Sequence, residues 1–222
     1  MNHPLRIIHH LSKTGGTIIN RCLGCMQDII LLSEVHPFNI GVDHHPLQQA
    51  YCWFNLLTTE EIQAINAEGF ISFADSIKLI YQKVQEKNQT LVLRDWNYLD
   101  FFDIPYTAPT QILSTNQAFQ EQFHLLEVAI VRHPIDQWYS MQRLPDYRQI
   151  SLEDYLTGYL NFIESCHGVT FIHYENFACF PEKTMQTICQ ILDLNYDADF
   201  THNWVNYKTI TGSSKELHCV TL

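Results

Sequence analysis

The sequence lacks three features, and each absence excludes a class of protein. No run of about 18 consecutive apolar residues occurs in its 222 residues, so we expect no membrane span. Lysine and arginine number 13 against 24 acidic residues, which disfavours nucleic acid and heparin-like polyanions as partners. Cys22 and Cys25 form a C-x-x-C, but no second pair follows at zinc spacing, which disfavours a zinc or redox site. We expect a cytoplasmic protein with one domain over residues 1–222, because 46% hydrophobic content suffices for one core.

Apolar runs alternate with helical patterns along the chain. This alternation predicts an α/β fold with three layers (α/β/α) around a central, mostly parallel sheet. Expected strands lie at 5–11, 28–34, 90–94, 125–131 and 169–174. Expected helices lie at 16–26, 46–55, 58–67, 70–87, 134–143, 151–166 and 181–193.

A glycine-bearing turn, residues 12–17, follows the first expected strand. Gly15 and Gly16 let the backbone approach an anion, and the helix that opens next offers free N–H groups and the positive end of its dipole. A Walker A loop has its lysine after the glycines, whereas Lys13 precedes them. The turn therefore predicts a phosphate-like anion site that is not a Walker A loop, or else it only starts a helix.

A second candidate anion site follows a later expected strand. The run 127–131 leads into Arg132, and Ser140 falls on the next expected helix. Open parallel sheets bind ligands at the carboxyl ends of their strands. Arginine can fork onto a phosphate and a serine hydroxyl adds a donor. The alternative is an arginine that pairs locally and a serine on a solvated helix face.

Together these segments resemble the sulfotransferase family, whose sulfuryl donor is 3′-phosphoadenosine-5′-phosphosulfate (PAPS). The family's 5′-phosphosulfate loop is similar to residues 13–17, and its 3′-phosphate motif is similar to 132–140. Residues 171–177 look like a further family element, and 208–214 look like its C-terminal glycine-containing loop. The four matches follow the family's order over nearly the whole chain, and they imply its P-loop-NTPase-like fold.

The resemblance implies a PAPS-dependent sulfotransferase. It would move a sulfuryl group to a hydroxyl or amine of a small or lipophilic acceptor, release 3′,5′-ADP and need no metal. Lys13 would act at the bridging oxygen. Many family members have a tryptophan near the adenine where this chain has Ile18, so adenine contacts differ here. The implied donor-binding residues are Lys13, Thr14, Gly15, Gly16, Thr17, Arg132, Ser140, Lys208, Gly212 and Ser213.

The group that accepts the acceptor's proton is open at this point. Small-molecule members of the family have a histidine after the third strand, where this chain has Asp95. Asp95 is the leading candidate, and His44 and His45 are alternatives; Asp95 could equally cap a helix or pair with Arg94. The aromatic-rich segment 95–110 either suits an apolar acceptor or caps the core.

Two other functions compete with this interpretation. A catalytically silent protein that binds 3′,5′-ADP or another nucleotide would share the fold, although the presence of Lys13 argues against it. A P-loop kinase is disfavoured by the missing Walker A order and by the lack of an aspartate suited to Mg²⁺.

Overall fold

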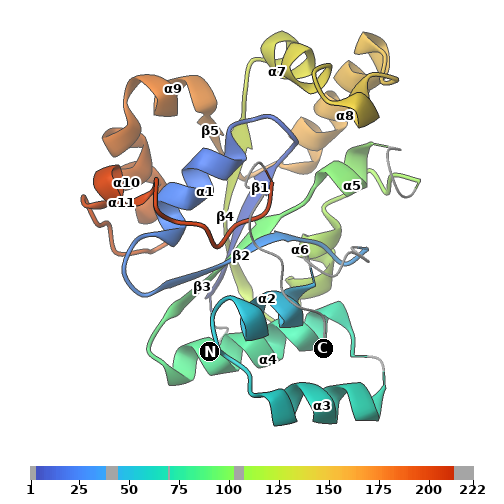
Figure 1. Cartoon of the computed structure of the whole chain (residues 1–222). Coiled ribbons are helices and arrows are strands. Elements are labelled where there is room, and N and C mark those ends of the chain that lie inside the picture. Colours follow the sequence, from blue (N-terminus) through green and yellow to red (C-terminus); the bar gives the residue numbers. More distant parts are fainter. Residues whose placement is uncertain (1–3, 39–44, 70, 103–107, 213–222) are drawn as a thin grey trace.

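Five parallel strands form one sheet in the order β2-β3-β1-β4-β5 (Figure 1). The computed structural model describes residues 4–38, 45–69, 71–102 and 108–212. The strands are β1 (Pro4–His10), β2 (Ile29–Val35), β3 (Thr90–Asp95), β4 (His124–Val131) and β5 (Thr170–His173). The helices are α1 (Gly16–Gly24), α2 (Pro46–Cys52), α3 (Thr59–Glu68), α4 (Phe73–Glu86), α5 (Tyr98–Phe101), α6 (Ser114–Phe119), α7 (Pro134–Met141), the 3₁₀ turn η2 (Pro145–Tyr147), α8 (Leu152–Ser165), α9 (Tyr174–Cys179), α10 (Pro181–Ile191) and α11 (Phe200–Asn203).

The strand order places a crevice at the middle of the sheet. β1 pairs with β3 on one side and with β4 on the other, so the chain changes direction across the sheet at β1. In open parallel sheets, ligands bind at the carboxyl ends of the strands at such a switch point. The loops after β1, β3 and β4 therefore border the expected binding site.

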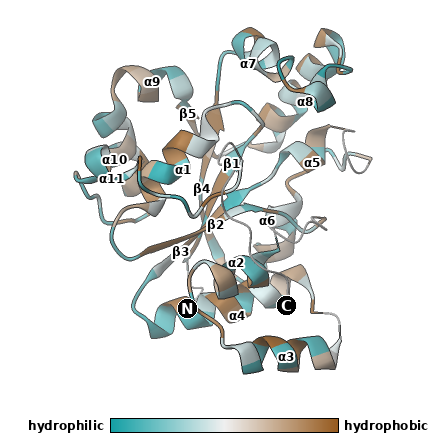
Figure 2. Ribbon diagram, viewed as in Figure 1, coloured by the Kyte–Doolittle hydropathy of each residue, from teal (hydrophilic) through white to brown (hydrophobic). Residues whose placement is uncertain are grey.

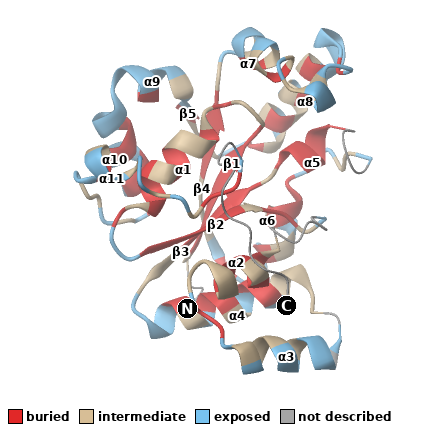
Figure 3. Cartoon of the chain, in the orientation of Figure 1, coloured by how far each residue is buried: buried red, intermediate tan, exposed pale blue. Residues whose placement is uncertain are grey.

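Side chains alternate between the two faces of the sheet, and each face has its own helices. Ile8 and Val92 pack in a core cluster with residues of α1, α10 and α11. Ile7 and Leu93, one position along, pack in a cluster with residues of α2 and α4. Figure 1 shows these two groups of helices on different sides of the sheet, and Figures 2 and 3 show that the strands between them are apolar and buried.

The expected fold class is confirmed, and the expected elements agree with those observed to within three residues at each end. Sequence reasoning missed the short helices α5, α6, α9 and α11. Helices of four to six residues are too short to display the 3.6-residue period. Within the described parts of the chain, no helix has the length and apolar character that crossing a bilayer requires.

Candidate functional site

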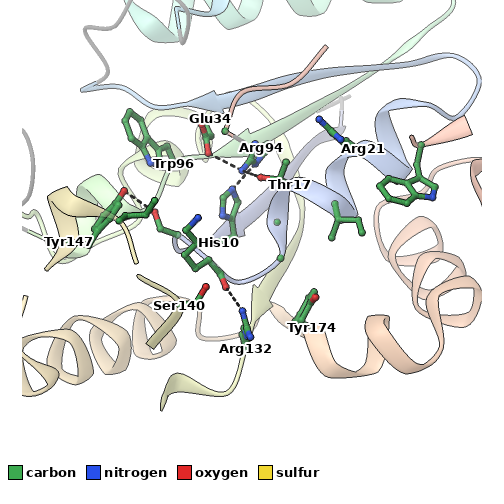
Figure 4. Close-up of a pocket in the computed structure, with 18 residues that line it drawn as sticks. His10, Thr17, Arg21, Glu34, Arg94, Trp96, Arg132, Ser140, Tyr147 and Tyr174 are labelled. Carbon is green, nitrogen blue, oxygen red and sulfur yellow. Dashed lines mark hydrogen bonds and ion pairs between the residues drawn. The ribbon is translucent and has the colours of Figure 1, made fainter. Parts of the chain in front are cut away.

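A cavity of about 600 Å³ lies where the carboxyl ends of the central strands meet the start of α1 (Figure 4). Its lining brings together the turn after β1, the ends of β2 and β3, the β4–α7 connection and the last described residues of the chain. Ligand pockets of small molecules and cofactors commonly measure about 300–1,000 Å³. The cavity is therefore large enough for a nucleotide-sized ligand.

The turn after β1 is held in an unusual backbone conformation. Lys13 and Gly15 both have positive φ, 66° and 84°, and Gly15 precedes the first residue of α1. A Cβ at Gly15 would lie 2.1 Å from the Tyr174 ring, and one at Gly16 would lie 2.9 Å from His10 Nδ1. Both positions thus require glycine for packing as well as for any close approach to an anion. A strained non-glycine residue such as Lys13 points to function.

The β4–α7 connection is fastened directly to this turn. Arg132 Nη1 donates to the carbonyl of Lys13 at 3.3 Å, and Gln137 Nε2 donates to that of Ser12 at 2.7 Å. The Arg132 guanidinium also lies over the Tyr174 ring, 5.2 Å from its centroid. As a result Lys13, Arg132 and Ser140 line one cavity, as their assignment to a common ligand requires (Figure 4).

Arg94 occupies the floor of the cavity, and sequence reasoning did not select it. It is only 2% exposed and makes five hydrogen bonds, which equals its number of N–H groups. Nε donates to His10 Nε2 at 2.8 Å. Burial and the Arg94 charge lower the pKa of His10 to about 3, so this imidazole is neutral with its proton on Nδ1, which donates to the Leu11 carbonyl.

Glu34 is the carboxylate that lines the cavity, and a bulge at the end of β2 brings it there. The register with β3 shifts between Leu32 and Val35, and Glu34 has φ 52°. Because of the bulge, both Ser33 and Glu34 reach Arg94; Arg94 Nη2 donates to Glu34 Oε1 at 2.9 Å. Bulges often re-aim a side chain next to an active site. The positive φ is a cost of about 1–2 kcal/mol accepted at this position.

The α2 helix secures the bulge. Gln49 Oε1 accepts from the Ser33 N–H, and Gln49 Nε2 donates to the Ser33 carbonyl, both at 2.7 Å. Gln49 is fully buried. Its amide thus takes the place of a neighbouring strand for the backbone groups that the bulge would otherwise leave unpaired.

The two ends of the cavity differ in character. Trp96 and Tyr147 lie on one side and Arg21 on the opposite side (Figure 4). Ile18 and Trp204 also line it; α1 carries Ile18 and Arg21, and Trp204 ends α11, which packs against α1. Arg21 Nε is buried and has no hydrogen-bond partner within the described part of the chain.

Asp95 does not line the cavity and belongs to a second network. We call it the sealed network because none of its residues lines the cavity. Its carboxylate is 0% exposed, lies 3.1 Å from His9 Nδ1 and accepts from Asn97 and Thr115. Glu127 lies 2.9 Å from His9 Nε2. Burial opposes a charge on His9, but the two carboxylates outweigh it and raise the pKa of His9 to about 9. Asp95 pairs with His9 and not with Arg94.

The remaining predicted residues divide between the cavity and other places. His45 caps α2, where its Nδ1 accepts from the Leu47 N–H at 3.3 Å, and it does not line the cavity. Lys208 is exposed and also lies outside the lining, whereas Gly212 lines it beside Thr17. His44 and Ser213 fall outside the described residues.

The aromatic-rich segment is divided between the cavity lining and the core. Trp96 lines the cavity, whereas Tyr98, Phe101 and Phe102 are buried in the core cluster with residues of α7 and α8. Residues 103–107 of the segment lie outside the described part of the chain.

The charges around the cavity favour an anionic ligand. Lys13, Arg21, Arg94 and Arg132 line it against the single carboxylate of Glu34 within the described lining, in a chain of net charge −11. Positive charge is therefore concentrated here. No group of three or more His, Cys, Asp or Glu in the described ranges is arranged to hold a metal ion.

Comparisons with known proteins agree with this architecture. No family model matches the sequence, and no curated protein matches it. The solved sulfotransferase domain of the Synechococcus PCC 7002 olefin synthase superposes with a TM-score of 0.64 at 18% identity, covering 90% of this chain and 76% of that one. The chain has the sulfotransferase fold. The sulfotransferase domain of the curacin biosynthetic pathway has a TM-score of 0.67 at 15% identity, with 95% and 81% covered.

Within this sulfotransferase fold, the residues that sequence reasoning missed are Glu34, Arg94, Arg21 and Trp204. Two signals could have found the first pair. Glu34 is an acidic residue at the end of an otherwise apolar strand, and Arg94 is a charge within a strand expected to be buried. Arg21 and Trp204 carry no such local signal, because only the packing of α11 on α1 brings them to one cavity.

Proposed function

We propose that the chain is a PAPS-dependent sulfotransferase that acts on a hydroxyl or amine of a small or lipophilic acceptor. One observation carries the proposal. A single cavity is lined by the Lys13 turn, by Arg132 and Ser140, and by the carboxylate of Glu34. These are the parts that the reaction needs: donor-binding cations, a cation for the leaving group and a base.

The donor's two phosphate-bearing ends have separate partners in this proposal. The backbone N–H groups of residues 14–17 and the N-terminus of α1 would hold the 5′-phosphate, because free N–H groups and the helix dipole favour an anion there. Arg132 and Ser140 would hold the 3′-phosphate through charge-assisted hydrogen bonds. The Tyr174 ring beneath the Arg132 guanidinium supports that side chain.

The adenosine end would lie between α1 and the end of α11. Ile18 offers only aliphatic contact where a stacking ring is expected, but Trp204 lines the same cavity. The unpartnered Nε of Arg21 is a buried donor without a partner in the described structure, and a ligand acceptor atom would satisfy it. These two residues replace the missing tryptophan contact in the proposal.

Glu34 is the proposed general base. His10 is neutral, but its Nε2 already accepts from Arg94 Nε and is not free to take a proton. Asp95 has no exposed area. Glu34 lines the cavity, and a carboxylate has about four lone-pair sites, so it can accept a further proton beside its bond to Arg94.

PAPS supplies the sulfuryl group. The acceptor oxygen or nitrogen would form the new bond to sulfur while the bridging S–O bond breaks and its electron pair passes to the phosphate oxygen. Lys13 would stabilise the charge that develops on that oxygen, and Glu34 would take the acceptor's proton. Trp96, Leu144 and Tyr147 line the cavity and suit an apolar acceptor.

The proposal is tested by transfer of label from ³⁵S-PAPS to a panel of phenols, alcohols and amines. We expect wild-type protein to label at least one class. Lys13→Ala should lower the rate about 10²- to 10³-fold, comparable with loss of one oxyanion-stabilising donor. Lys78→Ala is the matched control, because Lys78 is exposed on α4 and does not line the cavity.

Two results would count against the proposal. Binding of 3′,5′-ADP without transfer to any acceptor would indicate a silent binding protein. Equal turnover of Lys13→Ala and Lys78→Ala would remove Lys13 from the mechanism.

A further inference from the structure

The last described residues of the chain, 208–212, lead to the cavity, where Thr211 contacts Glu34 and Gly212 joins the lining. We call this segment the strap. Ile210 anchors it, since its side chain is 1% exposed, and Gly212 reaches the Thr17 hydroxyl, where an added Cβ would lie 3.1 Å away. Thr211 lies between them and is buried. The strap is thus held to the site by its two buried residues, Ile210 and Thr211.

Thr211 contacts the floor of the cavity through every polar group it has. Its Oγ1 donates to Glu34 Oε2 at 2.6 Å and lies 2.8 Å from Ser33 Oγ. Its N–H donates to Ser33 Oγ at 3.1 Å, and its carbonyl accepts from Arg94 Nη1 at 3.2 Å. Four hydrogen bonds therefore join one residue of the strap to β2 and β3.

The direction of each hydroxyl bond follows from counting protons. An ionised carboxylate only accepts, so the single proton of the Thr211 hydroxyl goes to Glu34. Ser33 must then donate its own proton to Thr211 Oγ1. The Ser33 oxygen keeps its lone pairs for Arg94 Nη1, at 3.0 Å, and for the Thr211 N–H. Arg94, Ser33, Thr211 and Glu34 thus form a closed ring in which every donor has one acceptor.

The ring gives each oxygen of Glu34 one fixed donor. Arg94 binds Oε1 and Thr211 binds Oε2, so the carboxylate can neither rotate nor turn away from the cavity without breaking a bond. Charge-assisted bonds of this kind are stronger than neutral ones and add geometric precision.

We infer that Thr211 is a positioning residue for Glu34, and that the strap completes the catalytic centre from the opposite end of the sequence. The inference rests on the proposed function of Glu34 as general base. The strap's role in this structure is therefore at the base, and Lys208, the residue expected to reach the donor, stays outside the cavity lining.

Kinetics of three variants test the inference with the acceptor found in the ³⁵S-PAPS panel. Thr211→Val keeps the side-chain shape and the backbone contacts but loses the donor to Glu34. We expect kcat to fall about 10- to 100-fold, while KM for PAPS changes less than about twofold. Thr211→Ser should restore most of kcat. Thr209→Val, in the same strap but outside the cavity lining, should match wild type.

A direct titration of the Glu34 carboxyl keeps the test independent of the acceptor. ¹³C-glutamate labelling, with Glu34→Gln to assign the signal, follows its protonation. Loss of a donor to the carboxylate disfavours the charged form, so Thr211→Val should move the midpoint to higher pH and Thr211→Ser should move it back. Arg94 contacts Glu34, and His10, Lys13, Arg21 and Arg132 line the same cavity; all five are unchanged in these variants.

An unchanged midpoint in Thr211→Val, or an unchanged kcat, would overturn the inference even if Glu34→Gln is inactive. Thermal melting of each variant shows whether a loss reflects unfolding, and the serine variant separates that outcome from a lost donor. Calorimetric binding of 3′,5′-ADP is measured on the same samples. Failure of wild-type protein to bind it would contradict the proposed function and would leave the titration result standing.

Discussion

Two charged networks lie on opposite faces of the sheet near the carboxyl ends of its central strands, and only one of them lines the cavity. His10 on β1 and Arg94 on β3 belong to the network around Glu34. Their immediate neighbours, His9 and Asp95, belong to the sealed network with Glu127. Successive residues of a strand point to opposite faces, so one position along the chain separates the two.

The comparison shows that burial and charge alone do not distinguish the network that lines the cavity. His9 and Asp95 are as buried as Arg94. The sealed network fastens β1 to β3 and β4, and its polar groups find partners inside the protein. The other network also contains a strained backbone at Glu34, and the charged side chain of Lys13 lines the same cavity. Strain at a cavity, rather than burial, separates the two.

Removing the carboxylate charge from each network in turn gives the largest expected contrast. Glu34→Gln should lower kcat about 10²- to 10⁴-fold, the usual contribution of a general base, while the affinity for 3′,5′-ADP is retained. Steady-state ³⁵S transfer and calorimetry measure the two quantities. If the rate were unchanged, the base would have to lie elsewhere, and the distinction between the networks would lose its functional meaning.

Asp95→Asn should act on stability instead of rate. It leaves His9 with one charged partner in place of two, and breaking a buried, hydrogen-bonded pair costs about 3 kcal/mol of unfolding free energy. Denaturant unfolding measures the loss, and kcat per folded molecule should stay within about threefold of wild type. A selective loss of kcat with full stability would instead return Asp95 to the mechanism.

The sealed network should also give the stability of the protein a pH dependence. The folded-state pKa of His9, about 9, lies above its ordinary value of 6.5. The contribution of His9 to the unfolding free energy is therefore complete below pH 6.5. It is lost as the pH rises through 9, by an amount on the order of 3 kcal/mol. Unfolding free energies of wild type and His9→Gln between pH 6 and about 9.5 test this.

The His9→Gln variant should lack the alkaline decline, and a parallel decline in both proteins would contradict the assignment. His10 contributes with the opposite sign. Its pKa is lowered to about 3, so the stability it gives is present above pH 6.5 and is lost as the pH falls toward 3. The two adjacent histidines thus place the expected maximum of stability near pH 6.5.

The fold was predictable because its signals are local. The apolar runs of the five strands and the longer helices have the expected periodicity, and their order alone predicts a parallel sheet. β1 and β4 are neighbours in the sheet, so their carboxyl ends bring the turn at Lys13 next to the segment at Arg132. The sequence therefore allowed these two motifs to be assigned to one site.

The proposed base, Glu34, was not predictable from the sequence for a physical reason. Asp95 and Arg94 differ by one position, and sequence reasoning could not assign which of them faces α1. Glu34 reaches that face only because of the bulge held by Gln49, and Thr211 reaches Glu34 from 177 positions away in the chain. Such contacts depend on tertiary packing, which no local pattern encodes.

The most direct test of the account is calorimetric titration of the wild-type protein with 3′,5′-ADP and with ATP, each with and without Mg²⁺. The cavity has positive charge at two anchor points, the turn at Lys13 and the side chain of Arg132, which suit the two phosphate-bearing ends of 3′,5′-ADP. We predict tight binding of 3′,5′-ADP that does not depend on Mg²⁺, and much weaker binding of ATP. Preferential binding of Mg·ATP would contradict the account.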